Sequence, residues 1–465
     1  MSRYVKNKSE CGQLVTAACE DGYKRLIYPS IEREIRAELS ANAQEGAIKV
    51  FSSNLRQLLM QPPVKDTVTL GLDPGYAHGC KTAVVDATGK VLDTAIIYIT
   101  PPKKDTERAK RILTGFIKKY GVTTISIGNG TASRETEQFT AELIKEIPQK
   151  VSYMVVSEAG ASVYSASKLA AEEFPEYDVS LRSAVSIARR LQDPLAELVK
   201  IDPKAIGVGQ YQHDLPAARL KERLDFAVEK AVNLVGVNIN TASPTLLKHV
   251  AGLTSAMANN IVTYRQENGK ILSRQEIKKI PKIGTKSFEQ SAGFLRIEDG
   301  KEMLDRTSIH PESYKYAKIV LDILGLDEHA MGTQIAQKAV DSCNKEELLK
   351  QIECDSYTLN DILDSIKQPL RDYRDKNDGP ILRSDILELE DLHVHDKLQG
   401  TVRNVVDFGV FVDIGLHEDG LIHISQMADH KIGHPSEMVS VGDIIDVWVY
   451  KIDEEKHKVQ LTMIP

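Results

Sequence analysis

Two groups of side chains in this sequence have the types and spacing for chemistry on phosphate: two helix-joining turns and a pair of strand-end carboxylates. Lys282-Ile283-Gly284-Thr285-Lys286 places a glycine between lysines, and Ala251-Gly252-Leu253-Thr254 forms a similar turn upstream. N–H groups at the start of a helix, with the helix dipole behind them, suit a phosphate. We therefore predict phosphate contacts at the residues of both turns: Gly252, Thr254, Lys282, Ile283, Gly284, Thr285 and Lys286.

The local charge agrees with this prediction. From Gly236 to Glu298 the chain carries nine Lys/Arg against four Glu, whereas its net charge is −7. The repeated pattern of helix, glycine turn and helix is typical of a tandem helix-hairpin-helix module, which holds nucleic-acid backbone without reading sequence. The plainer alternative is a helical bundle whose glycines are ordinary helix caps. The second turn is the stronger candidate, because the first has no adjacent lysine.

The carboxylates suggest a different chemistry. Asp73 ends a predicted strand (68–73) and Glu158 follows another (151–156), with Glu135 a weaker candidate. Carboxylates at strand ends hold the two divalent cations of many nucleases. However, the helix at 181–190, where a third acidic ligand is expected, has none, and Asp178 and Asp193 lie outside it. We predict an inactive nuclease fold with no metal or other cofactor. Mg²⁺ or Mn²⁺ binding at Asp73 and Glu158 remains the alternative, and in the plainest interpretation the two residues only cap a turn and a helix.

The elements that position these residues predict a multidomain α+β protein. Three strands (68–73, 82–86 and 91–97, the last two joined by a hairpin turn) precede a helix at 106–120, a strand at 123–128, a helix from 133, a strand at 151–156 and helices over 160–200. This order is that of a ribonuclease-H-like α/β domain. Two helices before residue 65, an amphipathic connector at 220–235 and helices after 297 surround it, with a charged, turn-rich linker at 371–380. Five strands between 398 and 462 predict a C-terminal OB-fold barrel.

The barrel sequence resembles the OB-fold RNA-binding module first named from a ribosomal small-subunit protein. That resemblance implies a platform for base stacking at Phe408, Phe411 and His423, with Asp453 and Lys458 as the polar pair at its edge and Arg403 beside it. Stacking contributes about 1–3 kcal/mol per base. The segment from Leu398 to Pro465 carries five Lys/Arg against eleven Asp/Glu, so a protein-binding module is the alternative.

Long blocks of the chain resemble the Tex family of bacterial transcription accessory proteins. They include Gly71-Leu72-Asp73-Pro74-Gly75, the stretches 127–137 and 158–165, and the run 188–200 with 207–214. The resemblance implies a YqgF-type nuclease-like domain, a tandem helix-hairpin-helix and the OB-fold domain, after a large helical region of which residues 1–65 are expected to be a remnant. The predicted domains are 1–65 (helical), 66–205 (YqgF), 206–235 (connector), 236–298 (helix-hairpin-helix), 299–390 (helical domain and linker) and 391–465 (OB-fold).

Composition limits the alternatives. Five scattered cysteines without metal-ligand spacing predict free thiols in the cytoplasm. No apolar run approaches the ~20 residues of a membrane helix. We expect a monomer that binds single-stranded RNA, with DNA and the transcription or translation machinery as further candidate partners. The competing hypotheses are a metal-dependent nuclease and a protein-interaction scaffold of the elongation machinery, since a eukaryotic histone-chaperone elongation factor shares this domain order by family resemblance.

Overall fold

The computed structural model of the chain describes residues 10–352, 354–376, 382, 392–416, 419–430, 432–439, 443–453 and 458–464. None of the helices in these ranges is long and apolar enough to cross a bilayer. All five cysteines are free thiols, as predicted.

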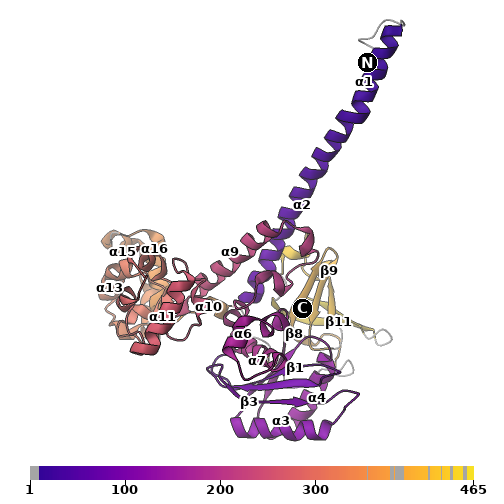
Figure 1. The fold of residues 1–465 in the computed structure, drawn as a ribbon. Helices are drawn as coiled ribbons and strands as arrows, with labels where there is room; N and C mark the ends of the chain where they lie inside the picture. Colours follow the sequence, from indigo (N-terminus) through magenta and orange to yellow (C-terminus); the bar gives the residue numbers. More distant parts are fainter. Residues whose placement is uncertain are drawn as a thin grey trace.

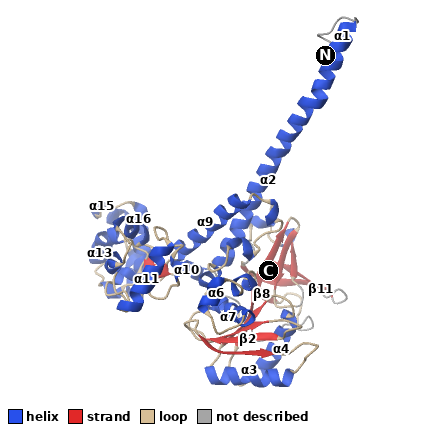
Figure 2. Cartoon of the chain, viewed as in Figure 1, coloured by secondary structure: helices blue, strands red, loops and turns tan. Residues whose placement is uncertain are grey.

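The first helices form a long projecting rod (Figures 1 and 2). α1 (Glu10–Gly22), the π-helical turn η1 (Tyr23–Ile27) and α2 (Tyr28–Leu59) follow one another without a break, and the two helices predicted before residue 65 are parts of the single helix α2. Only the last part of α2 is buried, through Ile48, Phe51, Leu55 and Leu59. These side chains share one hydrophobic core with the connector helix and the helix-hairpin-helix module.

The nuclease-like domain is built on a mixed five-stranded sheet with the order β3-β2-β1-β4-β5. Its strands are β1 (Thr69–Asp73), β2 (Cys80–Val85), β3 (Val91–Ile97), β4 (Thr124–Gly128) and β5 (Ser152–Val156). β1 pairs antiparallel with β2 and parallel with β4, so the buried strand β1 ends at Asp73 in the middle of the sheet. The first three strands form an antiparallel meander, and β4 and β5 add to it in parallel with β1. This arrangement confirms the predicted topology.

Helices cover both faces of this sheet (Figure 1). α3 (Thr106–Tyr120) and α4 (Ser133–Glu146) pack on the face that carries Leu70 and Leu72. α7 (Val179–Gln192) packs on the other face, so closely that a Cβ on Gly71 would lie 2.3 Å from the Ala184 carbonyl oxygen. This close approach brings the start of α7 over the end of β1. The remaining segments are α5 (Ala161–Ser165), α6 (Lys168–Glu173), α8 (Pro194–Leu198), η2 (Pro203–Ile206) and η3 (Gln212–Asp214).

The connector α9 (Ala217–Val235) leads into the predicted helical hairpins. The hairpins consist of α10 (Pro244–Leu247), α11 (Ser255–Asn268), the 3₁₀ segment η4 (Arg274–Lys279) and α12 (Thr285–Ser291), closed by a two-stranded ladder of β6 (Val237–Asn238) and β7 (Leu295–Arg296). Ser243 caps α10, as its position before Pro244 indicates. The third helix of the predicted four is the 3₁₀ segment.

A separate helical domain follows, with its own core. It contains η5 (Met303–Arg306), η6 (Pro311–Ser313), α13 (Tyr314–Ile323), η7 (Glu328–Ala330), α14 (Gln334–Ser342), α15 (Lys345–Gln351) and α16 (Ser356–Lys367). The chain then returns through η8 (Tyr373–Lys376), the start of the predicted linker, where Asp372 and Arg374 are buried.

The C-terminal domain is a closed barrel with the strand order β10-β12-β11-β8-β9. Its strands are β8 (Lys397–Val406), β9 (Gly409–Asp413), β10 (Gly420–His423), β11 (Ile444–Asp453) and β12 (Lys458–Thr462), with short helical turns η10 (Ile424–Gln426) and η11 (Pro435–Glu437). The predicted five-stranded barrel is therefore confirmed.

Candidate nucleic-acid interface

The two hairpin turns correspond residue by residue in backbone conformation. Gly252 and Lys282 both have positive φ (+80° and +70°). Leu253 and Ile283, which follow them, are both buried. Thr254 and Gly284 then serve as the N-caps of α11 and α12, both with extended backbone. The glycine of the first turn is thus equivalent to Lys282, and Gly284 occupies the cap position.

The first turn is covered by the second hairpin. A Cβ on Gly252 would lie 2.6 Å from Gln290 Cβ and 3.1 Å from the Ser287 carbonyl oxygen, both on α12. Nothing lies within 4 Å of the corresponding point at Gly284. A ligand backbone can therefore approach Gly284 closely, whereas Gly252 is needed for packing between the hairpins.

Several cations of this module are wholly or partly buried and donate to backbone carbonyls. Arg274 is 1 % exposed and donates to the carbonyls of Leu295, Thr307 and Ile309. Arg296 is largely buried and donates to the Arg371 carbonyl, while Arg265 donates to that of Ile239. The charge excess read from the sequence therefore overstates the charge that a ligand meets.

The exposed cations gather instead at the second turn. Lys282 and Lys286 flank Gly284, and Lys278 and Lys279 at the end of η4 are also exposed. Lys278 Nζ lies 4.5 Å from the centre of the Phe288 ring on α12, which holds it beside the turn. Asn260 Nδ2 on α11 donates to the Pro281 carbonyl at 2.8 Å and fixes the turn from the other side. The two η4 lysines were not predicted as contacts, although their place in the basic run before Pro281 was a usable signal.

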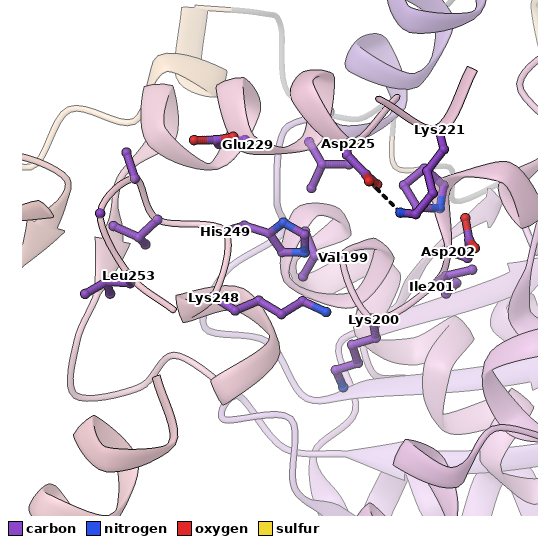
Figure 3. Close-up of a pocket in the computed structure, with 15 residues that line it drawn as sticks. Val199, Lys200, Ile201, Asp202, Lys221, Asp225, Glu229, Lys248, His249 and Leu253 are labelled. Carbon is purple, nitrogen blue, oxygen red and sulfur yellow. Dashed lines mark hydrogen bonds and ion pairs between the residues drawn. The ribbon is translucent and has the colours of Figure 1, made fainter. Parts of the chain in front are cut away.

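A cavity of about 560 Å³ lies beside the first turn, between α9 and the segment after α8 (Figure 3). Lys248 and His249 line it, and burial lowers the pKa of His249 to about 4, with help from Lys248. Asp202, Asp225 and Glu229 line the same cavity. The cavity walls are therefore mixed in charge.

The barrel brings the predicted ring residues together. Phe408 and Phe411 form an edge-to-face pair with centroids 6.3 Å apart, and Phe408 is 51 % exposed. His423 on β10 is the register partner of Gly409, next to Phe408, and its Nδ1 is paired with the Ser425 hydroxyl at 2.9 Å. Phe408 in the turn between β8 and β9, the half-buried Phe411 on β9 and the exposed His423 on β10 form a surface on which bases can stack.

The polar residues predicted around this surface are either paired with another side chain or placed on other strands. Arg403 Nη2 donates to Asp413 Oδ2 at 2.6 Å, so its charge is already paired. Asp453 and Lys458 are register partners at the end of the β11–β12 ladder, on different strands from the rings. The residues between them lie outside the described ranges.

The two predicted carboxylates of the nuclease-like domain lie close together. The Glu158 carboxylate lies over Gly130, where a Cβ would be 1.9 Å from Glu158 Oε1, and Glu158 N donates to Asn129 Oδ1 at 3.0 Å. Burial raises the pKa of Asp73 to about 6, opposed by Lys81 and assisted by the negative charge of Glu158. Of the other acids considered, Glu135 accepts from Tyr76, and Asp178 and Asp193 cap α7 and α8.

A serine occupies the place near Asp73 where a third carboxylate was expected. Ser183, buried on α7, lies beside Asp73, and its hydroxyl partly opposes the rise in the pKa of that carboxyl group. Among the described residues no group of three or more His, Cys, Asp or Glu side chains is placed to hold a metal. This donor set does not fit a three-carboxylate metal site.

Four family models match the chain: the Tex protein YqgF-like domain over residues 67–192, the helix-hairpin-helix motif over 232–296, the HHH domain over 302–374 and the S1 RNA binding domain over 391–464. The S1 match covers the barrel, including the rings at its surface. The helix-hairpin-helix match includes both turns.

Whole-chain relatives extend this similarity. The Bacillus subtilis protein YdcI is 53% identical over 461 residues, which are 99% of this chain and 64% of that protein. Transcriptional accessory protein Tex of Neisseria gonorrhoeae is 47% identical over 481 residues, 99% of this chain and 62% of Tex. Human S1 RNA-binding domain-containing protein 1 is 38% identical over 519 residues, 98% of this chain and 52% of the human protein. The chain thus spans about three fifths of its bacterial relatives, and it belongs to the Tex family.

Proposed function

We propose that this chain is a nucleic-acid-binding accessory factor of transcription that holds phosphate at its second hairpin turn and stacks single-stranded RNA bases on its barrel. The observation that carries the proposal is the Phe408–Phe411 ring pair, with Phe408 half exposed, within the match to the S1 RNA binding domain. Rings placed in this way favour unpaired bases of any sequence. Single-stranded DNA is a second ligand of the same chemistry.

The second turn supplies the electrostatic part of the proposed binding. Lys282 and Lys286 are exposed, and the open space at Gly284 admits a phosphodiester backbone. Because the whole chain carries a net charge of −7, initial capture of RNA requires a local positive surface such as this one. We propose Lys282, Gly284, Thr285 and Lys286 as contacts, and Gly252, Thr254 and Ile283 as residues that shape the two turns.

At the barrel we propose Phe408, Phe411 and His423 as stacking residues and Lys458 as a phosphate contact near Asp453. Arg403 can contact an RNA phosphate only when its ion pair with Asp413 is broken. The acidic character of the barrel predicts weak binding there, and the steep decline of RNA affinity with salt is expected from the cationic contacts at the second turn.

The role in transcription rests on relatives of which this chain spans only part. One relative is named transcriptional accessory protein Tex, so we extend that role to this chain as a proposal. The nuclease-like domain then acts as a scaffold. The closeness of Asp73 and Glu158 favours metal-dependent cleavage as the second candidate function.

A titration tests the proposal. Fluorescently labelled single-stranded RNA of about 20 nucleotides is titrated with the full chain at 50 and 200 mM salt, alongside single-stranded DNA and an RNA duplex of the same length. We expect measurable RNA binding that weakens strongly at the higher salt. Absence of RNA binding at 50 mM salt would exclude the proposed function, and degradation of the RNA with added Mg²⁺ or Mn²⁺ would favour the nuclease.

A further inference from the structure

Helix α3 of the nuclease-like domain has an unusually clear division between two faces. Ala109, Leu113 and Ile117 are buried against the sheet. Arg108, Arg111 and Lys118 are exposed and occupy the opposite side of the helix, since their spacing of three and seven residues repeats the helical turn. Gly115 falls on the same side, with nothing within 4 Å of the point where its Cβ would lie.

The cations on this outward face differ from the other lysines of α3 in their salt bridges. Other lysines of α3 are paired: Lys110 with Glu146, and Lys119 with Asp93. In contrast, no acidic side chain in the described part of the chain forms a salt bridge with Arg108, Arg111 or Lys118. Arg111 Nε donates to the backbone carbonyl of Glu107, which is a neutral acceptor.

The preceding loop adds to this charge. Lys103 and Lys104 are exposed just before Asp105, whose carboxylate caps α3 by accepting from Arg108 N. The segment 103–119 contains seven Lys/Arg and two acidic residues, the same excess of five as the helix-hairpin-helix module. We call the exposed cations Lys104, Arg108, Arg111 and Lys118 the α3 basic face.

The α3 basic face is separate from the surfaces proposed above. α3 lies on the side of the sheet away from α7, and Figure 1 shows it below the sheet at the bottom of the view, apart from the hairpin helices α10 and α11 at the left. A ligand on this face would therefore not compete for the second hairpin turn.

The chemistry of the face favours a double helix over a single strand. The exposed positions of the face carry no aromatic ring, so unpaired bases have nothing to stack on. A duplex hides its bases and presents phosphates in two rows. Arg111 and Lys118 are seven residues apart, about 10 Å along the helix axis, which is close to the ~12 Å width of a B-DNA major groove. Arg111 and Lys118, on either side of Gly115, can thus reach phosphates on both rims of the groove.

We propose that the α3 basic face binds the phosphate backbone of double-stranded DNA, as a second nucleic-acid surface beyond the proposed RNA-binding site. Binding there is independent of sequence, because it uses phosphate contacts alone.

The test compares the full chain with an Arg108→Glu/Arg111→Glu variant and an Arg108→Gln/Arg111→Gln variant. Each is titrated with a 30-base-pair DNA duplex and with single-stranded RNA across a salt series, and thermal unfolding checks the fold. In a plot of the logarithm of the binding constant against the logarithm of the salt concentration, loss of two phosphate contacts should reduce the steepness of the slope by about two. Duplex affinity should fall at least about tenfold at 0.1 M salt. RNA affinity should change much less.

The matched control is Arg33→Glu/Arg36→Glu on α2, an exposed pair with the same spacing and charge change. It should leave duplex affinity within about twofold of that of the wild type. Unchanged duplex binding in the α3 variants, an equal loss in the α2 control, or an equal loss for RNA would each overturn the proposal. Because RNA binding is measured in parallel, failure of the α3 proposal remains distinct from failure of the proposed RNA-binding function.

Discussion

Arg374 Nη1 donates to Asp193 Oδ1 at 2.7 Å, although the two residues are 181 positions apart. Asp193 lies where α7 ends and α8 begins, whereas Arg374 follows the helical domain. Arg374 Nη2 also donates to Asp372 at 2.8 Å, and Lys65 pairs with the same carboxylate. This ionic cluster ties the end of the helical domain to the nuclease-like domain.

We predict that Arg374→Met destabilises the chain by about 3–5 kcal/mol, the usual effect of removing one partner of a buried ion pair. The arginine is only 3% exposed, so its loss leaves Asp372 buried with a single cation beside it. Thermal and urea unfolding of the full chain measure the change. Arg36→Met, which removes an exposed pair with Glu32 on α2, should have little effect. Equal stability of the two variants would contradict a structural role for the cluster.

Elements with strong periodicity were predictable from the sequence. The bounds of α3 agree with the predicted helix 106–120, and the three-strand meander is confirmed. Each of these segments carries its pattern within itself: an apolar stripe, a glycine turn or alternating burial. The predicted domain limits stay predictions.

Contacts between distant parts of the chain were not predictable in this way. Arg274 counted as a surface cation in the sequence, but it donates to carbonyls 21 to 35 residues away. The correspondence of Gly252 with Lys282 was also hidden, because a lysine with positive φ gives no sign of it in the sequence. Similarly, only the packing of α7 over Gly71 shows that Ser183 lies beside Asp73.

Lys282→Ala/Lys286→Ala should weaken binding of single-stranded RNA about tenfold or more at 0.1 M salt, and flatten its salt dependence by up to two in log–log slope. The reason is the loss of two exposed charges beside the open Gly284 position. Lys338→Ala/Lys350→Ala removes the same charge from the helical domain and serves as the control. If the two double variants lose affinity equally, the effect is one of net charge and the second turn is not the binding site.

Phe408→Ala/Phe411→Ala should lower affinity for single-stranded RNA by about 1–3 kcal/mol per base that loses its stacking partner, with a salt slope close to that of the wild type. Stacking involves no counterion release, so this signature differs from that of the lysine variant. Fluorescence titration at three salt concentrations measures both quantities. Phe226→Ala, which removes an exposed ring from α9, should bind RNA as the wild type does; if it is equally impaired, the barrel surface is not the stacking site.

Asp73→Asn should stabilise the protein at pH 7.5 and leave its stability almost unchanged at pH 4. The pKa of Asp73 is raised to about 6 in the folded chain, mainly by burial, so the folded state holds its proton after the unfolded chain, with a pKa near 4, has lost it. The free energy of unfolding of the wild type is therefore highest below pH 4 and falls as the pH rises to 6, by at most about 3 kcal/mol. The asparagine variant has no carboxyl group to ionise and avoids this loss.

Asp93→Asn, in the same sheet, is a control for which the expected change in stability has the opposite sign. A hydrogen bond from Tyr120 holds the pKa of Asp93 below its usual value, so its charged form stabilises the fold. That variant should be less stable than the wild type at pH 7.5. Thermal unfolding at the two pH values measures both changes. A loss of stability in Asp73→Asn at pH 7.5 would show that the charged carboxylate is stabilising and contradict the assigned effect of burial.

Incubation of the same variant with RNA and Mn²⁺ addresses the second candidate function, since cleavage by the wild type that is lost in Asp73→Asn would assign the chemistry to this carboxylate.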